Sequence, residues 1–237
     1  MIPQTLLPGR AAHAAVRIDD WMPVRPGGDA SVILPPAAAR RRREFEAGNH
    51  CAAQAIARLL AAPVASGAIG RLEDGSPQWP DGIVGSITHT RHLAAAAVMR
   101  AEDASGLGLD AEPLMSRNRA EKVARCIGSA AELSLIGEQA ALGPHEALTV
   151  IFSAKESIFK CLYPRVRRMF DYRAAVLEGV DLESGRFEAR LLTTLSREYR
   201  AGAPLKGRVV IDADVVFTAM HVGNRVDDRP ALACLPH

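Results

Sequence analysis

The stretch Gly-Leu-Gly-Leu-Asp-Ala-Glu, residues 106–112, decides how the rest of this chain is interpreted. Its apolar start followed by two acids predicts a β-strand that ends in carboxylates. In an extended strand, side chains two residues apart leave on the same face. Asp110 and Glu112 can therefore share one cation.

A second stretch, Phe-Ser-Ala-Lys-Glu-Ser-Ile-Phe-Lys at residues 152–160, has the spacing of a helix. Glu156 and Lys160 are four residues apart and therefore occupy one helical face. Three carboxylates and a lysine form a site for a hard divalent metal that carries phosphate. The two stretches together predict a protein that moves a phosphorylated group.

Composition narrows the class of protein. With 237 residues, 48% of them hydrophobic, the chain can bury a core as one large domain or two small ones. A net charge of +2 does not by itself argue for a nucleic-acid partner. Only four of the 29 basic residues are lysine, and two of these, Lys155 and Lys160, fall in one six-residue window. A compact ammonium there can hold a phosphate or pass a proton.

The cysteines predict a reducing compartment. Cys51, Cys126, Cys161 and Cys234 are scattered and contain no CxxC pair, which favours free thiols in a cytoplasmic protein over disulfides or a zinc site. Neither a signal peptide nor an apolar run of about 20 residues is evident. We therefore expect a cytoplasmic protein outside the membrane.

Periodicity predicts an α+β fold in two halves, residues 1–105 and 106–237, divided at the polar segment 102–105. Residues 1–36 are expected to be rich in loops. The first half should contain a helix at 37–62, ended by Pro63, and strands at 83–88 and 93–100. The second half should contain the following elements: strand 107–112, helices 119–126, 130–141 and 145–162, the last stopped by Pro164, and strands 171–178, 187–192, 206–211 and 215–221.

Four motifs in order resemble a known family. They are Trp-Pro-Asp-Gly at 79–82, Gly-Ser-Ile-Thr-His at 85–89, Leu-Gly-Leu-Asp-Ala-Glu-Pro at 107–113 and Phe-Ser-Ala-Lys-Glu-Ser at 152–157. Together they resemble the 4′-phosphopantetheinyl transferases of the surfactin-synthetase and enterobactin-synthetase type, over roughly Arg40 to Pro164. The resemblance implies a monomeric pseudo-dimer of two similar subdomains, each a small antiparallel sheet packed with a long helix. It places the active site in the cleft between them.

The resemblance also implies a reaction. Coenzyme A binds with Mg2+, for which Mn2+ can substitute, and a serine of an apo acyl or peptidyl carrier protein attacks its β-phosphate. The phosphopantetheine arm is transferred and 3′,5′-ADP leaves. The carriers belong to fatty-acid, polyketide or nonribosomal peptide synthases, often in secondary metabolism. This is the holo-[acyl-carrier-protein] synthase reaction.

Site residues are assigned by matching the family's motifs. Asp110 and Glu112 match its metal-binding pair and Glu156 its third acid, with either Glu156 or a water that it holds as the base. Lys160 matches a lysine that stabilises or protonates the leaving group. The coenzyme A contacts implied by the resemblance are Arg41, Arg71, Ser86, Thr88, His89, Lys155 and Lys160.

Two positions depart from the family's pattern. Asn49 stands where related members usually carry Arg, which removes a positive charge from the nucleotide-phosphate region. Arg42 or Arg43 then compensates, or the affinity for coenzyme A is lower than usual. Residue 111 is Ala, where some members have a third acidic or an apolar group, so the metal would take waters or substrate oxygens instead.

Several alternatives remain open from the residues alone. An Asp-x-Glu pair is often a solvated strand edge, and a Lys-Glu-x-x-x-Lys helix is often a surface ion-pair face. Arg40–Arg43 favours a solvated face or a polyanion-binding patch. The chain would then be a coenzyme A-binding or polyanion-binding protein without transferase activity, or a nucleic-acid-binding module, although no stacking or zinc signature supports the last. A nucleotide phosphotransferase is weakened by the lack of a GxxxxGK[ST] loop. The basic cluster Arg165, Arg167 and Arg168 is a candidate docking surface for an acidic carrier.

Overall fold

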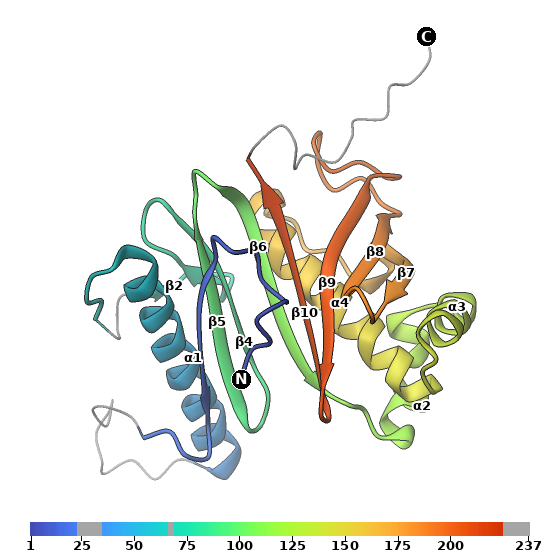
Figure 1. The fold of residues 1–237 in the computed structure, drawn as a ribbon, viewed down its shortest axis with the longest axis horizontal. Helices are drawn as coiled ribbons and strands as arrows, with labels where there is room; N and C mark the ends of the chain where they lie inside the picture. The colour runs from blue at the N-terminus through green and yellow to red at the C-terminus, as the bar shows by residue number, and fades with distance from the viewer. Residues whose placement is uncertain (23–34, 66–68, 225–237) are drawn as a thin grey trace.

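A computed structural model describes residues 1–22, 35–65 and 69–224 (Figure 1). The predicted α+β architecture is confirmed: two antiparallel sheets each pack against one long helix. No helix among these residues is both long and apolar enough to cross a membrane.

The first subdomain contains a three-stranded sheet in the order β1 (Ala12–Arg17), β5 (Leu93–Arg100), β4 (Ile83–His89). Helix α1 (Pro36–Leu60) covers one face of this sheet and buries Cys51 and Ile56 against its alanine-rich strands. The helix ends before Pro63, as predicted, with Ala61 in the left-handed conformation as its C-cap. A two-strand hairpin of β2 (Gly70–Arg71) and β3 (Pro77–Gln78) lies between α1 and β4 in the sequence.

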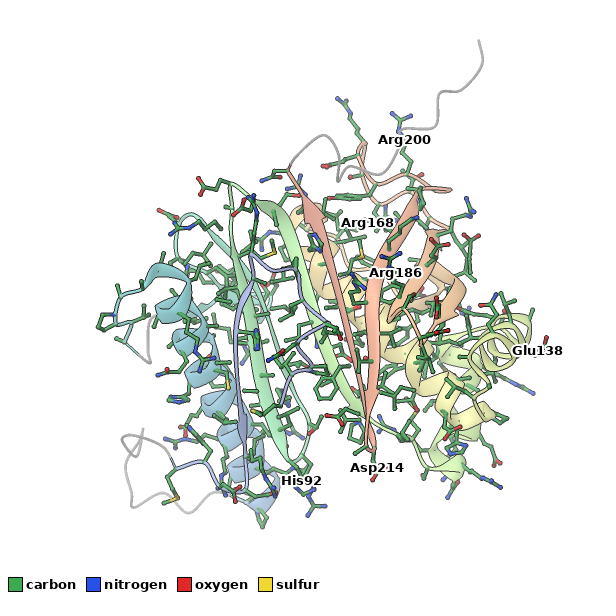
Figure 2. All side chains as sticks on the ribbon, viewed as in Figure 1. His92, Glu138, Arg168, Arg186, Arg200 and Asp214 are labelled. Carbon is green, nitrogen blue, oxygen red and sulfur yellow. The ribbon has the colours of Figure 1, made fainter. Side chains whose placement is uncertain are left out.

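The second subdomain contains a five-stranded sheet. Its order is β6 (Ala104–Pro113), β10 (Val215–Gly223), β9 (Pro204–Asp212), β8 (Arg186–Leu191), β7 (Ala175–Asp181). Helix α4 (Pro144–Val166) packs on one face. Helix α3 (Ala130–Ala140) contacts both α4 and β7, and helix α2 (Arg117–Ile127) contacts α4. Figure 2 shows side chains on both faces of the strands, with Asp214 at the tip of the β9–β10 turn.

Three local expectations are wrong. Residues 12–17 form β1 within the segment expected to be loop-rich, because all six of them pair with residues 93–98 of β5. Pro164 does not stop α4, which continues to Val166. A proline in the last turn removes a single helical hydrogen bond, so the helix can extend two residues beyond it. The segment predicted as strand 171–178 begins with the 3-10 turn η1 (Tyr172–Ala174) before β7.

Two glycines allow α4 to lie directly on β6. A Cβ atom at Gly108 would lie 1.9 Å from the carbonyl oxygen of Ser157, and one at Gly106 would lie 2.6 Å from that of Cys161. Alternation along the strand places Asp110 and Glu112 on this same face. The glycines of β6 therefore allow close contact with α4, and Asp110 and Glu112 place their carboxylates beside that contact.

The two sheets meet where β4 and β6 run side by side (Figure 1). Side-chain hydroxyls replace the usual strand-to-strand ladder. Ser86 Oγ accepts from the Leu109 amide at 2.9 Å and donates to its carbonyl at 3.3 Å, and Thr88 Oγ1 accepts from the Ala111 amide at 3.1 Å. We propose that the subdomains divide near residue 105, just after β6 begins. A shared core that includes Leu6 and Phe217 joins them on the opposite face.

Candidate active site

Asp110 is the most enclosed acid of the predicted site, with 2% of its surface exposed. Its Oδ1 lies 2.6 Å from Lys160 Nζ and accepts from Thr88 Oγ1 at 3.3 Å. Its Oδ2 accepts from Ser153 Oγ at 2.8 Å. Strand β6, strand β4 and helix α4 therefore all contribute to one carboxylate, which lies where the two subdomains meet.

Glu112 is held in an environment that disfavours its charge. Burial is the main cause that raises its pKa to about 7, and the nearby charges of Asp110 and Glu156 act in the same direction. Arg119 and Lys160 oppose this rise. Asp110 and Glu156 thus lie close enough to Glu112 to disfavour its charge, a repulsion that a divalent cation relieves.

This donor set fits a hard cation, because Mg2+ prefers carboxylate oxygens and substrate phosphate oxygens. Within the described residues, however, no three His, Cys, Asp or Glu side chains are gathered as a ready-made metal site. Asp110 instead pairs with Lys160, and Glu156 pairs with a tyrosine. The acids are neighbours without forming a closed ligand shell.

Glu156 accepts a hydrogen bond from the phenol of Tyr172, with the two oxygens 2.6 Å apart. Burial and this hydrogen bond raise the pKa of Tyr172 well above its usual value. No sequence pattern predicts this contact, since Tyr172 lies 16 residues further along the chain and inside a segment predicted as a strand.

The predicted coenzyme A contacts come from several elements. His89 Nδ1 at the end of β4 lies 3.9 Å from a carboxylate oxygen of Glu44 on α1. Burial lowers the pKa of His89, although the charge of Glu44 opposes this. Arg71 on β2 places its guanidinium carbon 5.7 Å from the centre of the Phe45 ring. Arg41 precedes Phe45 by one helical turn, so the two arginines flank one side of α1.

Two of the residues predicted to contact coenzyme A have partners within the protein. Lys155 is buried, and its Nζ donates to Glu132 Oε2 and to the Ile127 carbonyl, both at 2.9 Å. The hydroxyl of Ser86 is occupied by the backbone of Leu109. The buried ion pair argues against a direct phosphate contact by Lys155. The Ser86 hydroxyl bonds to backbone as that of Thr88 does, and Ser86 lines the same cavity as Lys160, so it stays a predicted contact. A Cβ at Gly48 would lie 2.8 Å from Ile87, so Gly48 lies where α1 meets β4, and Asn49 is the half-buried residue that follows it.

A cavity of about 290 Å³ opens beside Lys160, between the β2–β3 hairpin, β4 and the end of α4. Trp79 and Phe159 are among its apolar lining residues. The hairpin is tied to α4 because Asp74 Oδ2 accepts from the Tyr163 hydroxyl at 2.9 Å and lies 3.4 Å from Arg167 Nη1. Hydrogen bonds from Ser76 are the first cause that lowers the pKa of Asp74 to about 2, and Tyr163 and Arg167 contribute.

Comparisons with known sequences agree with this arrangement. Residues 29–99 match the 4′-phosphopantetheinyl transferase N-terminal domain, and residues 106–212 match the 4′-phosphopantetheinyl transferase superfamily. The 4′-phosphopantetheinyl transferase Svp of Streptomyces mobaraensis is 37% identical over 175 residues, 70% of this chain and 69% of that protein. Npt of Nocardia iowensis is 30% identical over 79% of this chain and 85% of its own length. Enterobactin synthase component D of Salmonella typhimurium is 35% identical over 56% of this chain and 53% of its own length.

Proposed function

The chain belongs to the 4′-phosphopantetheinyl transferase superfamily and transfers the 4′-phosphopantetheine arm of coenzyme A to a carrier protein, and we propose that the acids and lysine between β6 and α4 perform this transfer. The observation that carries the proposal is the pairing of buried Asp110 with Lys160 beside Glu112, whose pKa is raised. Charges arranged in this way suit a diphosphate and its counterion.

Asp110, Glu112 and Glu156 are the residues that would hold Mg2+, or Mn2+ in its place. Bound there, the cation would neutralise the charge of the diphosphate during attack. Buried Asp110 and the raised pKa of Glu112, to which the charges of Asp110 and Glu156 contribute, support this assignment.

Glu156 is the proposed base. A serine hydroxyl is a weak nucleophile until a group within hydrogen-bond reach takes its proton, and Glu156 does so directly or through a water that it holds. The serine oxygen then bonds to the β-phosphorus of coenzyme A, and the bond from that phosphorus to the bridging oxygen of 3′,5′-ADP breaks. Lys160, a quarter exposed beside the cleft cavity, stabilises the charge that develops on the departing oxygen.

We assign coenzyme A binding to basic and hydroxyl side chains on α1, β2, β4 and α4. Arg41 and Arg71 supply charge for the nucleotide phosphates, and His89 and Thr88 contact the diphosphate region together with Lys160. Arg41 and Arg71 suit this role because a guanidinium binds phosphate in a bidentate manner. Lys155 is left out because it is buried against Glu132, whereas Ser86 is kept because it lines the same cavity as Lys160.

The proposed partners are apo carrier proteins of fatty-acid, polyketide or nonribosomal peptide synthases, with secondary metabolism favoured by the relatives. We propose a monomer that acts in the cytoplasm, where coenzyme A is found. Arg165 pairs with Glu198 and Arg167 with Asp74, so exposed Arg168 is the best candidate to meet an acidic carrier (Figure 2). A carrier KM unchanged by Arg168→Glu would reject that docking surface.

The test of the transferase is intact-mass spectrometry of an apo carrier incubated with the protein, coenzyme A and Mg2+. We expect a mass gain of one phosphopantetheine, abolished by EDTA and by Asp110→Ala. Several folded carriers that gain no mass would leave the alternative of a coenzyme A-binding or polyanion-binding protein without transferase activity.

A further inference from the structure

Tyr172 lies outside helix α4 and contacts Glu156, which that helix carries. The phenol oxygen lies 2.6 Å from Glu156 Oε1, within the range of short hydrogen bonds between a hydroxyl and a carboxylate. Tyr172 is the hydrogen-bond partner of the Glu156 carboxylate among the described residues, so its second oxygen, Oε2, is left for a metal or for the serine proton.

The backbone around Tyr172 is fixed independently of Glu156. Tyr172 opens the turn η1, which is capped by Asp171 through a hydrogen bond from the Arg173 amide at 2.9 Å. The turn is joined to the β-sheet because the Leu192 amide donates to the Ala174 carbonyl at 2.8 Å. The phenol is therefore presented by a braced segment rather than by a free loop.

The ring of Tyr172 is held as well. It packs against Phe152 on α4, with ring centroids 5.4 Å apart. Phe152 lies one turn before Glu156 on the same helical face. A glutamate side chain otherwise loses rotamer entropy when a reaction requires one orientation. A hydrogen bond to a fixed phenol restricts that freedom before the substrates arrive.

We propose that Tyr172 is a positioning residue that orients Glu156 through Oε1 for its work in phosphopantetheine transfer. This inference rests on the proposed function, in which Glu156 is a metal ligand and base. Partners of this kind, which contact a ligating carboxylate rather than the metal, typically contribute about 10–100-fold in activity or metal affinity.

The decisive variant is Tyr172→Phe, which keeps the ring packing on Phe152 and removes only the hydroxyl. We expect kcat for carrier modification to fall about 10–100-fold while the KM for coenzyme A changes less than about twofold. Tyr199→Phe is the matched control, since the buried Tyr199 hydroxyl makes no hydrogen bond of normal geometry among the described residues and its charged neighbours are Arg165 and Glu198 rather than the acids of the site. The control should keep wild-type kcat.

A double-mutant cycle separates positioning from a structural role. If Tyr172 acts through Glu156, Tyr172→Phe should have no further effect in a Glu156→Gln background. Calorimetric titration of Mg2+ into the coenzyme A complex gives a second readout that does not depend on turnover. Unchanged kcat and Mg2+ affinity in Tyr172→Phe would overturn the inference, as would additive losses in the cycle. An inactive wild-type protein that nevertheless binds Mg2+ and coenzyme A would instead reject the proposed function, and the binding cycle would still test Tyr172.

Discussion

Lys160 Nζ lies 2.6 Å from Asp110 Oδ1, so a cation on α4 neutralises a carboxylate that β6 buries at the junction of the subdomains. The pair has unequal exposure, 25% for the lysine side chain and 3% for the aspartate. The lysine can therefore exchange this partner for a substrate phosphate, whereas the aspartate cannot reach solvent.

Removing Lys160 should affect both stability and chemistry. Lys160→Ala leaves Asp110 charged, buried and unpaired, which should lower the free energy of unfolding by about 3 kcal/mol without metal. Saturating Mg2+ should restore most of this loss, because the cation replaces the missing charge. In the transferase assay kcat should fall more than coenzyme A affinity. A raised KM at unchanged kcat would show that Lys160 only binds substrate.

The raised pKa of Glu112 predicts a pH-dependent metal affinity. A carboxylate must lose its proton to ligate, so Mg2+ affinity should rise as the pH increases from about 6 to about 8, by at most about tenfold per unit below the pKa of about 7. Calorimetry in two buffers of different ionisation enthalpy would reveal the released proton. Glu112→Asn should remove the proton release, and an affinity that is flat across this range would contradict the assignment.

The same shift affects the stability of the metal-free protein. Since the folded-state pKa of Glu112 lies above the usual 4.5, its contribution favours the folded state below pH 4.5 and is lost as the pH rises through about 7. Glu112→Gln, which stays neutral, should therefore raise Tm relative to wild type more at pH 8 than at pH 5. Equal effects at both values would show that the carboxyl ionises normally.

Lys155 should prove to be structural. Its ion pair with Glu132 is almost fully enclosed, with side-chain exposures of 3% and 2%, and Glu132 also accepts from the Leu177 amide at 2.7 Å. Lys155→Met leaves a buried carboxylate unpaired and should cost about 3–5 kcal/mol in urea unfolding. The double variant with Glu132→Gln should recover part of this loss. If Lys155→Met instead folds normally and raises the KM for coenzyme A, Lys155 is a phosphate contact after all.

The sequence predicted those features of the site that depend on local spacing. Asp110 and Glu112 lie on the same face because they are two residues apart in a strand. Glu156 and Lys160 do so because they are four residues apart in a helix. Neither inference needs knowledge of the fold. The spacing of residues in the sequence does not show which face of α4 is buried in the core. Lys155 lies about 100° around the helix from Glu156 and reaches α2 and α3 instead.

Contacts between segments that are distant in the sequence could not be predicted. Tyr172 approaches Glu156 only because η1 turns back onto α4, and the hydroxyls of Ser86 and Thr88 join β4 to β6 across more than 20 residues. Strand β1 was missed for a related reason. Its alanine-rich segment has little alternation, and pairing with β5 rather than intrinsic preference makes it a strand.

The close approach of β6 and α4 gives a final prediction. A methyl group at Gly108 would lie 1.9 Å from the Ser157 carbonyl oxygen, which is backbone and cannot rotate away. Gly108→Ala must therefore separate helix from strand, at a cost of about 1–3 kcal/mol or more, and must move Lys160 away from Asp110. Gly9→Ala is the matched control, because nothing lies within 4 Å of the added carbon. In Gly108→Ala the melting temperature and the rate of carrier modification should both be lower than in wild type, whereas Gly9→Ala should change neither. A Gly108→Ala protein with wild-type activity would show that the glycine contact does not set the distance between the acids and the lysine.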